Sequence, residues 1–333
     1  MSTSVTVSDR TPEVPPNERT TLLPSSVGSQ VPPSRNANRE SLGLVYMTAS
    51  ALGFSAMSLF VKLSGSKFPT MEIVFARSIW QVTMALLWCG WQGIHPLGPP
   101  AHRRWLLVRG TTGTLGLACF FYGLTHLPLA DATVVFFSNP VFTAILAHLA
   151  LGERFTGVDK LASLLCAVGI ILVAKPSFLF GTGQGEDALP GRLVGVVITL
   201  FGALMGAMGY VIVRKIGGNV HFLTHVVYFG GISALFSGFA MLGGAGFVLP
   251  SDITDYGMLC TVGVASFVGQ SFLNKGLQLS PAGPATLMRN LDVVFAFGFG
   301  IALFGEIPDV LSISGALLIV GCTVGMALRK WLL

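Results

Sequence analysis

Residues 285–306 read ATLMRNLDVVFAFGFGIALFGE, an apolar stretch long enough to cross a membrane that nevertheless contains Arg289, Asn290 and Asp292. One bilayer crossing needs roughly 20 apolar residues in helical form. An arginine or an aspartate at the centre of such a helix disfavours insertion by about 2.5–3.5 kcal/mol. Polar residues at this depth therefore face the inside of a helix bundle or a wet cavity, and they mark a candidate site.

The rest of the chain is equally apolar. Of its 333 residues, 52% are hydrophobic and 11% are charged, whereas soluble domains have about 25% charged residues. This composition excludes a water-soluble fold and predicts an all-α membrane protein. Short connections separate ten candidate spans, which cover residues 42–63, 71–91, 105–125, 130–151, 159–176, 191–213, 222–247, 255–277, 283–304 and 309–328.

Three regions organise the chain. Residues 1–40 are rich in proline, serine and threonine, and they predict a disordered N-terminal tail. The tail is followed by a first five-span unit over 41–180 and a second over 190–330. Lysine and arginine near span ends mark the cytosolic side of a membrane protein. If the N-terminus is cytosolic, eleven such residues lie on the cytosolic side: Arg35, Arg39, Arg103, Arg104, Arg154, Lys160, Arg214, Lys215, Lys275, Arg329 and Lys330. Four lie on the opposite side: Lys62, Lys67, Lys175 and Arg192. Both chain termini are therefore expected in the cytosol.

The two five-span units are related as repeats. An offset of 153 residues places Gly53 on Gly206, Lys62 on Lys215, Gly123 on Gly276, Pro128 on Pro281 and Gly152-Glu153 on Gly305-Glu306. Five is an odd number, so the second unit enters the membrane from the opposite side, which predicts an inverted repeat. Inverted repeats are typical of secondary transporters that hold their substrate near mid-membrane. Duplication for stability alone is the alternative.

A chain of five plus five spans, with Gly-Glu after spans four and nine, resembles the drug/metabolite transporter superfamily and its EamA domain. Residues 127–153 (LPLADATVVFFSNPVFTAILAHLALGE) and 282–297 (AGPATLMRNLDVVFAF) look more narrowly like subfamily G of solute carrier family 35. The resemblance implies a permease for a small organic metabolite that needs no bound cofactor. It does not name the substrate.

The candidate site is built around two positions that the repeat offset relates. Asp292 lies about halfway along its span, two residues after the further candidate Asn290, and Asn139 lies at the equivalent place in span four. Arg289 precedes Asp292 by three residues, so both can lie on one helical face. Two interpretations stay open: a neutralised pair that ties helices together, or an arginine that anchors an anionic substrate while Asp292 pairs with it or carries a proton.

Arg77 is a second buried cation, and Gln81 follows it by one helical turn. Its alternative partner is Asp131 at the outer rim. If Arg77 and Arg289 both face the cavity, the substrate is an organic anion such as a carboxylate or a phosphate ester, because the planar guanidinium suits those oxygens. Four further candidates could orient the substrate or simply tie helices together: His225, Tyr228, Gln270 and Asn274.

Two other sequence features bear on function. Glu153 and Glu306 each follow a glycine at a span end and are expected in short turns that cap the next helix. His126 and Asp131 match the His-x4-Asp pattern of acyltransferases, but they straddle a tight turn, so no enzyme is predicted.

The function predicted from the sequence is a secondary transporter of a small, anionic metabolite. The alternative is a non-transporting membrane adaptor that regulates other membrane proteins or ion homeostasis. The partners expected are the metabolite and the lipid bilayer, with no nucleic acid and no metal, and with proton coupling and a dimer left open. Glu18 and Leu22-Leu23 fit an acidic dileucine sorting pattern, so the membrane is the plasma membrane or an endosomal or vacuolar one.

Overall fold

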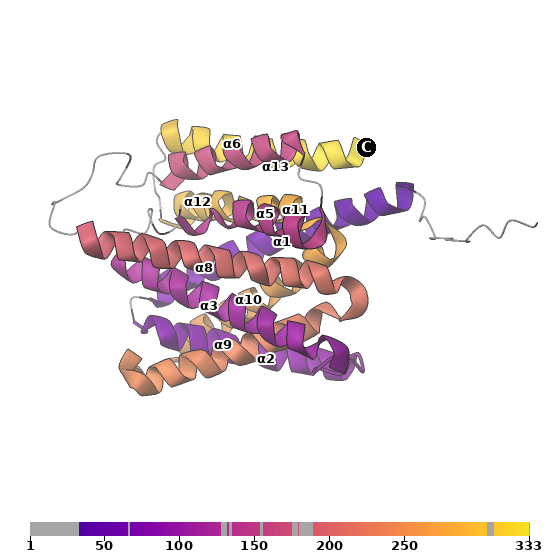
Figure 1. Cartoon of the computed structure of the whole chain (residues 1–333). Coiled ribbons are helices and arrows are strands. Elements are labelled where there is room, and N and C mark those ends of the chain that lie inside the picture. The colour runs from indigo at the N-terminus through magenta and orange to yellow at the C-terminus, as the bar shows by residue number, and fades with distance from the viewer. Residues whose placement is uncertain are drawn as a thin grey trace, which may run out of the picture.

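The computed structural model describes residues 33–65, 67–127, 132, 135–153, 156–174, 179, 189–304 and 310–332, and the regular elements in these ranges are helices (Figure 1). The first half contains α1 (Pro33–Ser64), α2 (Thr70–Trp91), η1 (Pro100–His102), α3 (Arg103–His126), α5 (Asn139–Leu151) and α6 (Gly157–Ala174). The second half contains α8 (Leu189–Ile216), η3 (Gly217–Asn219), α9 (Phe222–Ala240), η4 (Met241–Ala245), α10 (Ile253–Leu279), α11 (Ala282–Met288), α12 (Leu291–Phe304) and α13 (Val310–Leu332).

Six helical stretches of the described chain are long and apolar enough to cross a membrane: 38–64, 70–91, 193–219, 222–244, 253–279 and 282–303. Residues 139–151 and 310–325 form shorter apolar helices. The protein is therefore an integral, multi-pass α-helical membrane protein. The count of ten crossings stays a prediction from the sequence.

Helix α1 begins at Pro33, although the sequence predicted a tail up to residue 40 and a span from 42. Hydropathy marks the place where a helix enters lipid, whereas a helix formed in the membrane can continue into water. Proline is tolerated in the first turn because its missing N–H would have no intrahelical partner there. Residues 1–32 of the predicted tail, including the sorting pattern, lie outside the described residues.

The helices predicted over 130–151 and 283–304 are not continuous. Helix α5 starts only at Asn139, after a turn, and Pro140 lies in its first turn. Helices α11 and α12 are separated by Arg289 and Asn290, where the backbone N–H groups of Asp292 and Val293 bond three residues back at 3.0 and 3.1 Å. Each break brings polar side chains to the middle of an apolar segment.

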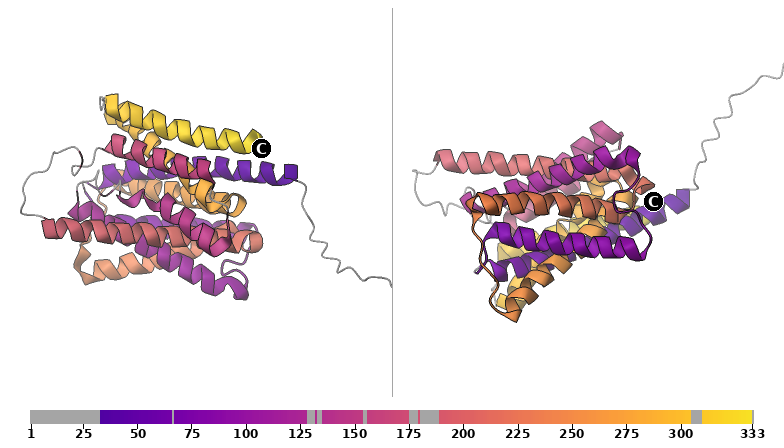
Figure 2. Two further views of the ribbon diagram at one scale, coloured as in Figure 1. Left: turned by 45° about the horizontal axis from the view of Figure 1, so that its top comes forward. Right: turned by 90° about the horizontal axis from the view of Figure 1, so that it is seen from below.

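The helices pack as a bundle in which α6 and α13 form one outer layer and α2 and α9 the opposite one (Figures 1 and 2). Between these layers, α1 packs against α10 and α3 packs against α8. Both pairings are close glycine contacts. A Cβ on Gly53 would lie 3.0 Å from the Cα of Gly269, and a Cβ on Gly116 would lie 3.0 Å from the backbone nitrogen of Gly206.

These contacts exchange under the 153-residue offset. Gly53 corresponds to Gly206 and Gly116 corresponds to Gly269, so the α1–α10 contact has its equivalent in the α8–α3 contact. The α2–α9 and α6–α13 pairs are each formed by two equivalent helices. The two halves therefore make matching contacts with each other.

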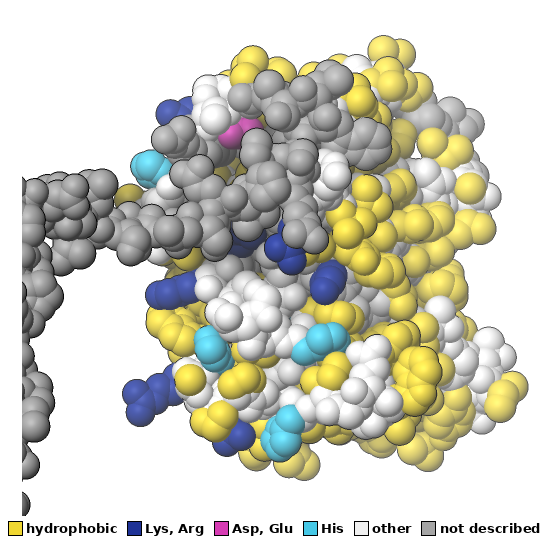
Figure 3. Space-filling view, turned by 90° about the vertical axis from the view of Figure 1, so that its right-hand side faces the viewer, with side chains coloured by type: hydrophobic (Ala, Val, Ile, Leu, Met, Phe, Trp, Pro, Cys, Tyr) yellow, Lys and Arg dark blue, Asp and Glu magenta, His cyan; other side chains and the backbone are white. Residues whose placement is uncertain are grey.

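One end of the bundle carries both the start of α1 and the end of α13 (Figures 1 and 2). The space-filling view of this end shows lysine, arginine and histidine side chains gathered on it (Figure 3). Arg103 and Arg104 begin α3 there, and Arg214 and Lys215 end α8. We call it the basic end.

Candidate functional site

A cavity of about 690 Å³ lies inside the bundle. Its lining comes from α1, α2, α3, α6, α8, α9, α10 and α12, together with the break before α12 and residues 136–137 before α5. On α1 the lining runs from Phe54 to Lys62, and on α12 it runs from Asp292 to Gly300. These are the parts of both helices that lead away from the middle of the bundle towards the end opposite the basic end.

Arg289 lies in the break between α11 and α12 and reaches into this cavity. Its guanidinium carbon lies 4.3 Å from the ring centroid of Phe54 on α1, and its Nη1 donates a hydrogen bond to the hydroxyl of Tyr210 on α8. Both partners come from helices at equivalent positions of the two repeats. Arg289 is thus held between the two halves of the protein.

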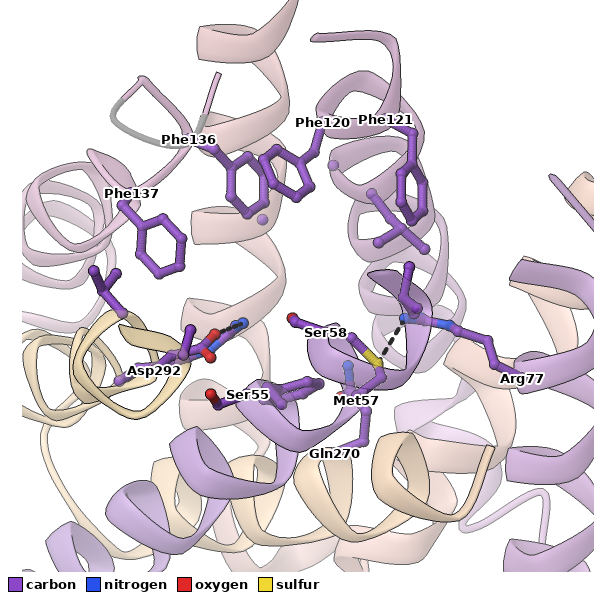
Figure 4. Close-up of a pocket in the computed structure, with 18 of the residues that line it drawn as sticks. Ser55, Met57, Ser58, Arg77, Phe120, Phe121, Phe136, Phe137, Gln270 and Asp292 are labelled. Atoms are coloured by element: carbon purple, nitrogen blue, oxygen red, sulfur yellow. Dashed lines mark hydrogen bonds and ion pairs between the residues drawn. The ribbon is translucent and has the colours of Figure 1, made fainter. Parts of the chain in front are cut away.

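Asp292 also lines the cavity, and it is only 7% exposed (Figure 4). Its Oδ2 lies 3.9 Å from Nη2 of Arg289, a distance that is too long for a hydrogen bond. The two side chains therefore form an ion pair without a hydrogen bond, and both interpretations that the sequence left open remain. Ser55 and Ser58 of α1 face the same space.

Arg77 of α2 and Arg109 of α3 meet at the ring of Phe229 on α9. Their guanidinium carbons lie 5.8 and 4.7 Å from its centroid. Arg109 donates hydrogen bonds from Nη2 to Oε1 of Gln270 at 3.2 Å and to Oδ1 of Asn274 at 3.3 Å. Among the described residues, Arg77 donates only to the sulfur of Met57, at 3.4 Å. Both arginines line the cavity.

The two arginines are buried, and no carboxylate of the described residues pairs with either of them. Arg77 is 3% and Arg109 is 2% exposed, and neither makes an ion pair with a described residue. A cation–π contact contributes roughly 0.5–2 kcal/mol, whereas removing an ion from water costs several kcal/mol. Phe229 alone therefore cannot offset the burial of two guanidinium groups. Gln270 and Asn274 contribute hydrogen bonds to Arg109, and for Arg77 the balance is expected from cavity water or from an anion.

Phenylalanine side chains form the wall across from Asp292 and the α1 serines (Figure 4). The rings of Phe120 and Phe136 stack with their centroids 4.2 Å apart, and Phe136 meets Phe137 edge to face at 6.4 Å. Phe121 lies beside them in the cavity lining. The site thus combines three arginine side chains with an apolar wall. This combination suits an organic anion with a hydrophobic or flat body.

The repeat-equivalent residue Asn139 does not line this cavity. Its Nδ2 donates to the carbonyl of Ala203 at 2.7 Å, and its Oδ1 accepts from Thr143 at 3.2 Å, so it ties α5 to α8. Asn139 and Asn290 line a small adjoining pocket behind Phe136 and Phe137. Asn290 is buried, and its Oδ1 has no hydrogen-bond partner among the described atoms.

Of the other predicted residues, Gln270 lines the cavity, and Asn274 acts through its hydrogen bond with Arg109. Gln81 ties three helices, because its Nε2 donates to the carbonyl of Val226 at 3.4 Å and its Oε1 accepts from Ser266 at 2.8 Å. The hydroxyl of Tyr228 donates to the carbonyl of Leu97 at 3.2 Å, away from the cavity.

His225 is fully buried beside the α2–α9 contact, and neither of its ring nitrogens has a hydrogen-bond partner among the described atoms. It is not part of the cavity lining. Asp131, the alternative partner of Arg77, lies outside the described residues.

Towards the basic end, the described helices pack tightly against one another. A hydrophobic cluster there joins the first half of α1, the last turns of α10 and helix α11, and includes Leu44, Met47, Leu277, Ala282 and Ala285. Glu153 closes the surface above it. Its Oε1 accepts a hydrogen bond from Nε of Arg214 at 2.7 Å, and its Oε2 accepts one from the backbone nitrogen of Ala282 at 2.8 Å. Glu153 thus caps α11, whereas the sequence predicted that it would cap the next helix along the chain.

Sequence reasoning missed Arg109 and Tyr210. Arg109 follows Arg103 and Arg104 within two turns of a helix start, where an arginine is expected to extend to the membrane surface. A signal was present in the glycines Gly110 and Gly113 beside it, since a Cβ on Gly113 would lie 2.8 Å from Nη1 of Arg109. Small residues next to a buried arginine make room for its side chain to turn inward.

An apolar helix bundle with an internal basic cavity, closed at one end, defines a membrane transport protein. The profile of the EamA-like transporter family matches residues 41–175 and 193–328, one copy in each half. The chain therefore belongs to the EamA-like transporter family.

Relatives with named roles support this assignment. The chain is 35% identical over 292 residues to solute carrier family 35 member G1 of Homo sapiens, an alignment that covers 87% of this chain and 80% of the relative. It is 30% identical over 290 residues to the pseudopaline exporter CntI of Pseudomonas aeruginosa (strain UCBPP-PA14), covering 86% and 96%. A solved crystal structure of a protein shares the fold, with a TM-score of 0.75 at 16% identity and coverage of 86% and 98%.

Proposed function

We propose that this protein is a secondary transporter that moves a small organic anion across a membrane by alternating access between two inverted repeats. The observation that carries the proposal is the internal cavity lined by three guanidinium groups, those of Arg77 and Arg109, which are buried, and that of Arg289, which is partly exposed, with a single lining carboxylate among the described residues. A carboxylate or a phosphate ester is the kind of ligand that planar guanidinium groups bind well.

Alternating access is supported by the different packing of the two ends. The cavity extends from mid-bundle towards one end, whereas the basic end is filled by the hydrophobic cluster and by the Glu153 hydrogen bonds. The matching contacts of α1 with α10 and of α8 with α3 allow the two halves to exchange roles. The opposite state would then be open at the basic end and closed at the other.

The basic residues support a cytosolic location for the closed end, because lysine and arginine are enriched on the cytosolic side of membrane proteins. Both chain termini would then be cytosolic, and this conformation would be open to the outside or to an organelle lumen. The sorting pattern in the tail favours an endosomal or vacuolar membrane beside the plasma membrane. Asp292 is the proposed proton acceptor if transport is coupled to protons.

The rival function, a non-transporting adaptor, would need a sealed core in which Arg289 and Asp292 neutralise each other. The cavity of about 690 Å³, which both side chains line, argues against a sealed core. The exporter role of a relative with 30% identity also favours transport.

The test is a thermal-shift screen of the purified protein with succinate, glycerol 3-phosphate and UDP-glucose, followed by uptake of radiolabelled hits into proteoliposomes. A ligand that binds only the folded state raises the melting temperature. We expect at least one anion to raise it and to exchange across the membrane faster than in protein-free liposomes. The proposal is wrong if anions neither stabilise the protein nor cross.

A further inference from the structure

The basic groups of the cavity form two separate sites. Arg289 belongs to the first, with Phe54, Tyr210 and Asp292 around it. The second site is formed by Arg77 of α2 and Arg109 of α3, which both contact the ring of Phe229 on α9. The first site contains a carboxylate that partly balances its charge, whereas no described acidic residue pairs with the second.

The second site has the properties of a preformed anion site. Arg109 is fixed by two neutral acceptors, Gln270 and Asn274, which orient its guanidinium without neutralising it. The Nε atoms of both Arg77 and Arg109 are buried without a hydrogen-bond partner among the described atoms. Fixed, desolvated and unneutralised donors bind an anion without a further cost of ordering.

We propose that Arg77 and Arg109 form a second anion-binding subsite, and that the substrate is an organic dianion whose two acidic groups are held separately by this subsite and by Arg289. The inference rests on the proposed anion transport and adds the number and placement of the acidic groups. Asp292 balances one of the three guanidinium charges, and a dianion balances the other two, whereas the fourth lining cation, Lys62, is exposed. The phenylalanine wall would cover the body of the substrate between its two charged ends.

The alternative is that Arg77 and Arg109 only brace α2, α3 and α9 against one another through Phe229. Bracing predicts equal effects of Arg109 substitutions on every ligand, through lower stability. A second subsite predicts an effect that depends on the charge of the ligand, so the two roles are separable by comparing ligands that differ by one charge.

The experiment uses the full-length protein in proteoliposomes with three dicarboxylates, succinate, glutarate and phthalate, each beside its own monomethyl ester. For wild-type protein we expect at least one dicarboxylate to bind at least tenfold more tightly than its ester, as measured by inhibition of exchange and by thermal shift. Loss of one fully desolvated charge contact produces a change of about this size. Equal affinity for both members of every pair that binds would overturn the two-subsite proposal and leave anion transport standing.

Substitutions test which arginine is responsible for the preference for a dicarboxylate over its monomethyl ester. Arg109→Gln should lower the dicarboxylate affinity about tenfold and leave the monoester affinity within about twofold, whereas Arg289→Gln should weaken both. Arg104→Gln, an exposed arginine on the same helix, is the matched control and should change neither. If Arg109→Gln does not fold, Gly113→Ala tests the same site, since its Cβ would intrude on Nη1 of Arg109 while keeping every charge.

Two results contradict the proposal. One is an Arg109→Gln or Gly113→Ala protein that folds normally and still prefers the dicarboxylate as strongly as wild type. The other is an equal loss of affinity for both members of each pair, which the bracing role predicts. Absence of binding by every acid and every ester would contradict anion transport itself.

Discussion

Glu153 accepts a hydrogen bond from Arg214 at 2.7 Å while its other carboxylate oxygen accepts one from the backbone of α11 at 2.8 Å. Arg214 in turn donates to the carbonyl of Gln278 at the end of α10, at 3.2 Å. One carboxylate therefore connects the ends of α5, α8, α10 and α11 above the hydrophobic cluster. Any opening of the cavity at the basic end has to break these contacts, because all four helix ends meet there.

The first prediction is that Glu153→Gln favours opening at the basic end. The change keeps the shape of the side chain but removes its charge, and hydrogen bonds to charged groups contribute about 1.5–3 kcal/mol. In a background without native cysteines, a Cys at Ala285 in the buried cluster should therefore react with a maleimide about tenfold faster. Asp252→Asn, the same change at the opposite end of the bundle, is the control and should not raise the rate. Unchanged labelling of Glu153→Gln would show that Glu153 does not hold the closed end.

The second prediction concerns Arg289. Arg289→Ala should lower uptake by about 30-fold or more, because removing one member of a desolvated charged contact costs about 2–5 kcal/mol. Uptake of the anion found by thermal shift into proteoliposomes measures it, with Arg104→Ala as the matched control. Detergent-stable protein of normal melting temperature with near-normal uptake would remove Arg289 from the substrate site.

The position of a polar residue along a helix is predictable from the sequence, but the direction in which it points is not. Asp292 and Asn139 are equivalent under the repeat offset, yet Asp292 faces the cavity and Asn139 bonds to Ala203. The difference arises because α5 packs closely on α8 at Gly206, where a Cβ would lie 2.7 Å from Nδ2 of Asn139. Such a contact depends on the packing of two helices and is not visible in either segment alone.

The apolar character, the repeat and the position of Arg289, Asp292, Arg77 and Gln270 inside the membrane follow from composition and insertion energetics. The breaks before α5 and α12 were not predicted, although Pro140, which favours the first turn of a helix over its interior, was a signal for the first of them. The break before α12 falls at Arg289 and Asn290, which carry no such signal. The inward direction of the Arg109 side chain could not be predicted either, because its hydrogen-bond acceptors, Gln270 and Asn274, lie on α10, 161 and 165 residues further along the chain.

The third prediction tests the matching glycine contacts of the two halves. Gly53→Ala and Gly116→Ala each place a methyl group about 3 Å from backbone atoms of the facing helix, which cannot move as a side chain can. Overpacking of this kind costs about 1–3 kcal/mol, so both variants should melt several degrees below wild type. Gly90→Ala is the control, because nothing lies within 4 Å of its added Cβ. A loss for one variant only would mean that the two contacts do not have equivalent roles.

The fourth prediction separates the two roles left open for Asp292. An asparagine at this position keeps the hydrogen-bonding shape but cannot take up a proton. If Asp292 carries the coupling proton, Asp292→Asn should lose the stimulation of net uptake by a pH gradient, because the loaded carrier no longer moves a proton with its substrate. Exchange of labelled for unlabelled substrate at equal pH on both sides should continue, since Arg289 and the rest of the cavity remain. Both fluxes are measured in proteoliposomes beside Asp252→Asn, which lies outside the cavity lining. Net uptake that responds to the gradient as in wild type would leave Asp292 with only the electrostatic role of balancing Arg289, which lies 3.9 Å away.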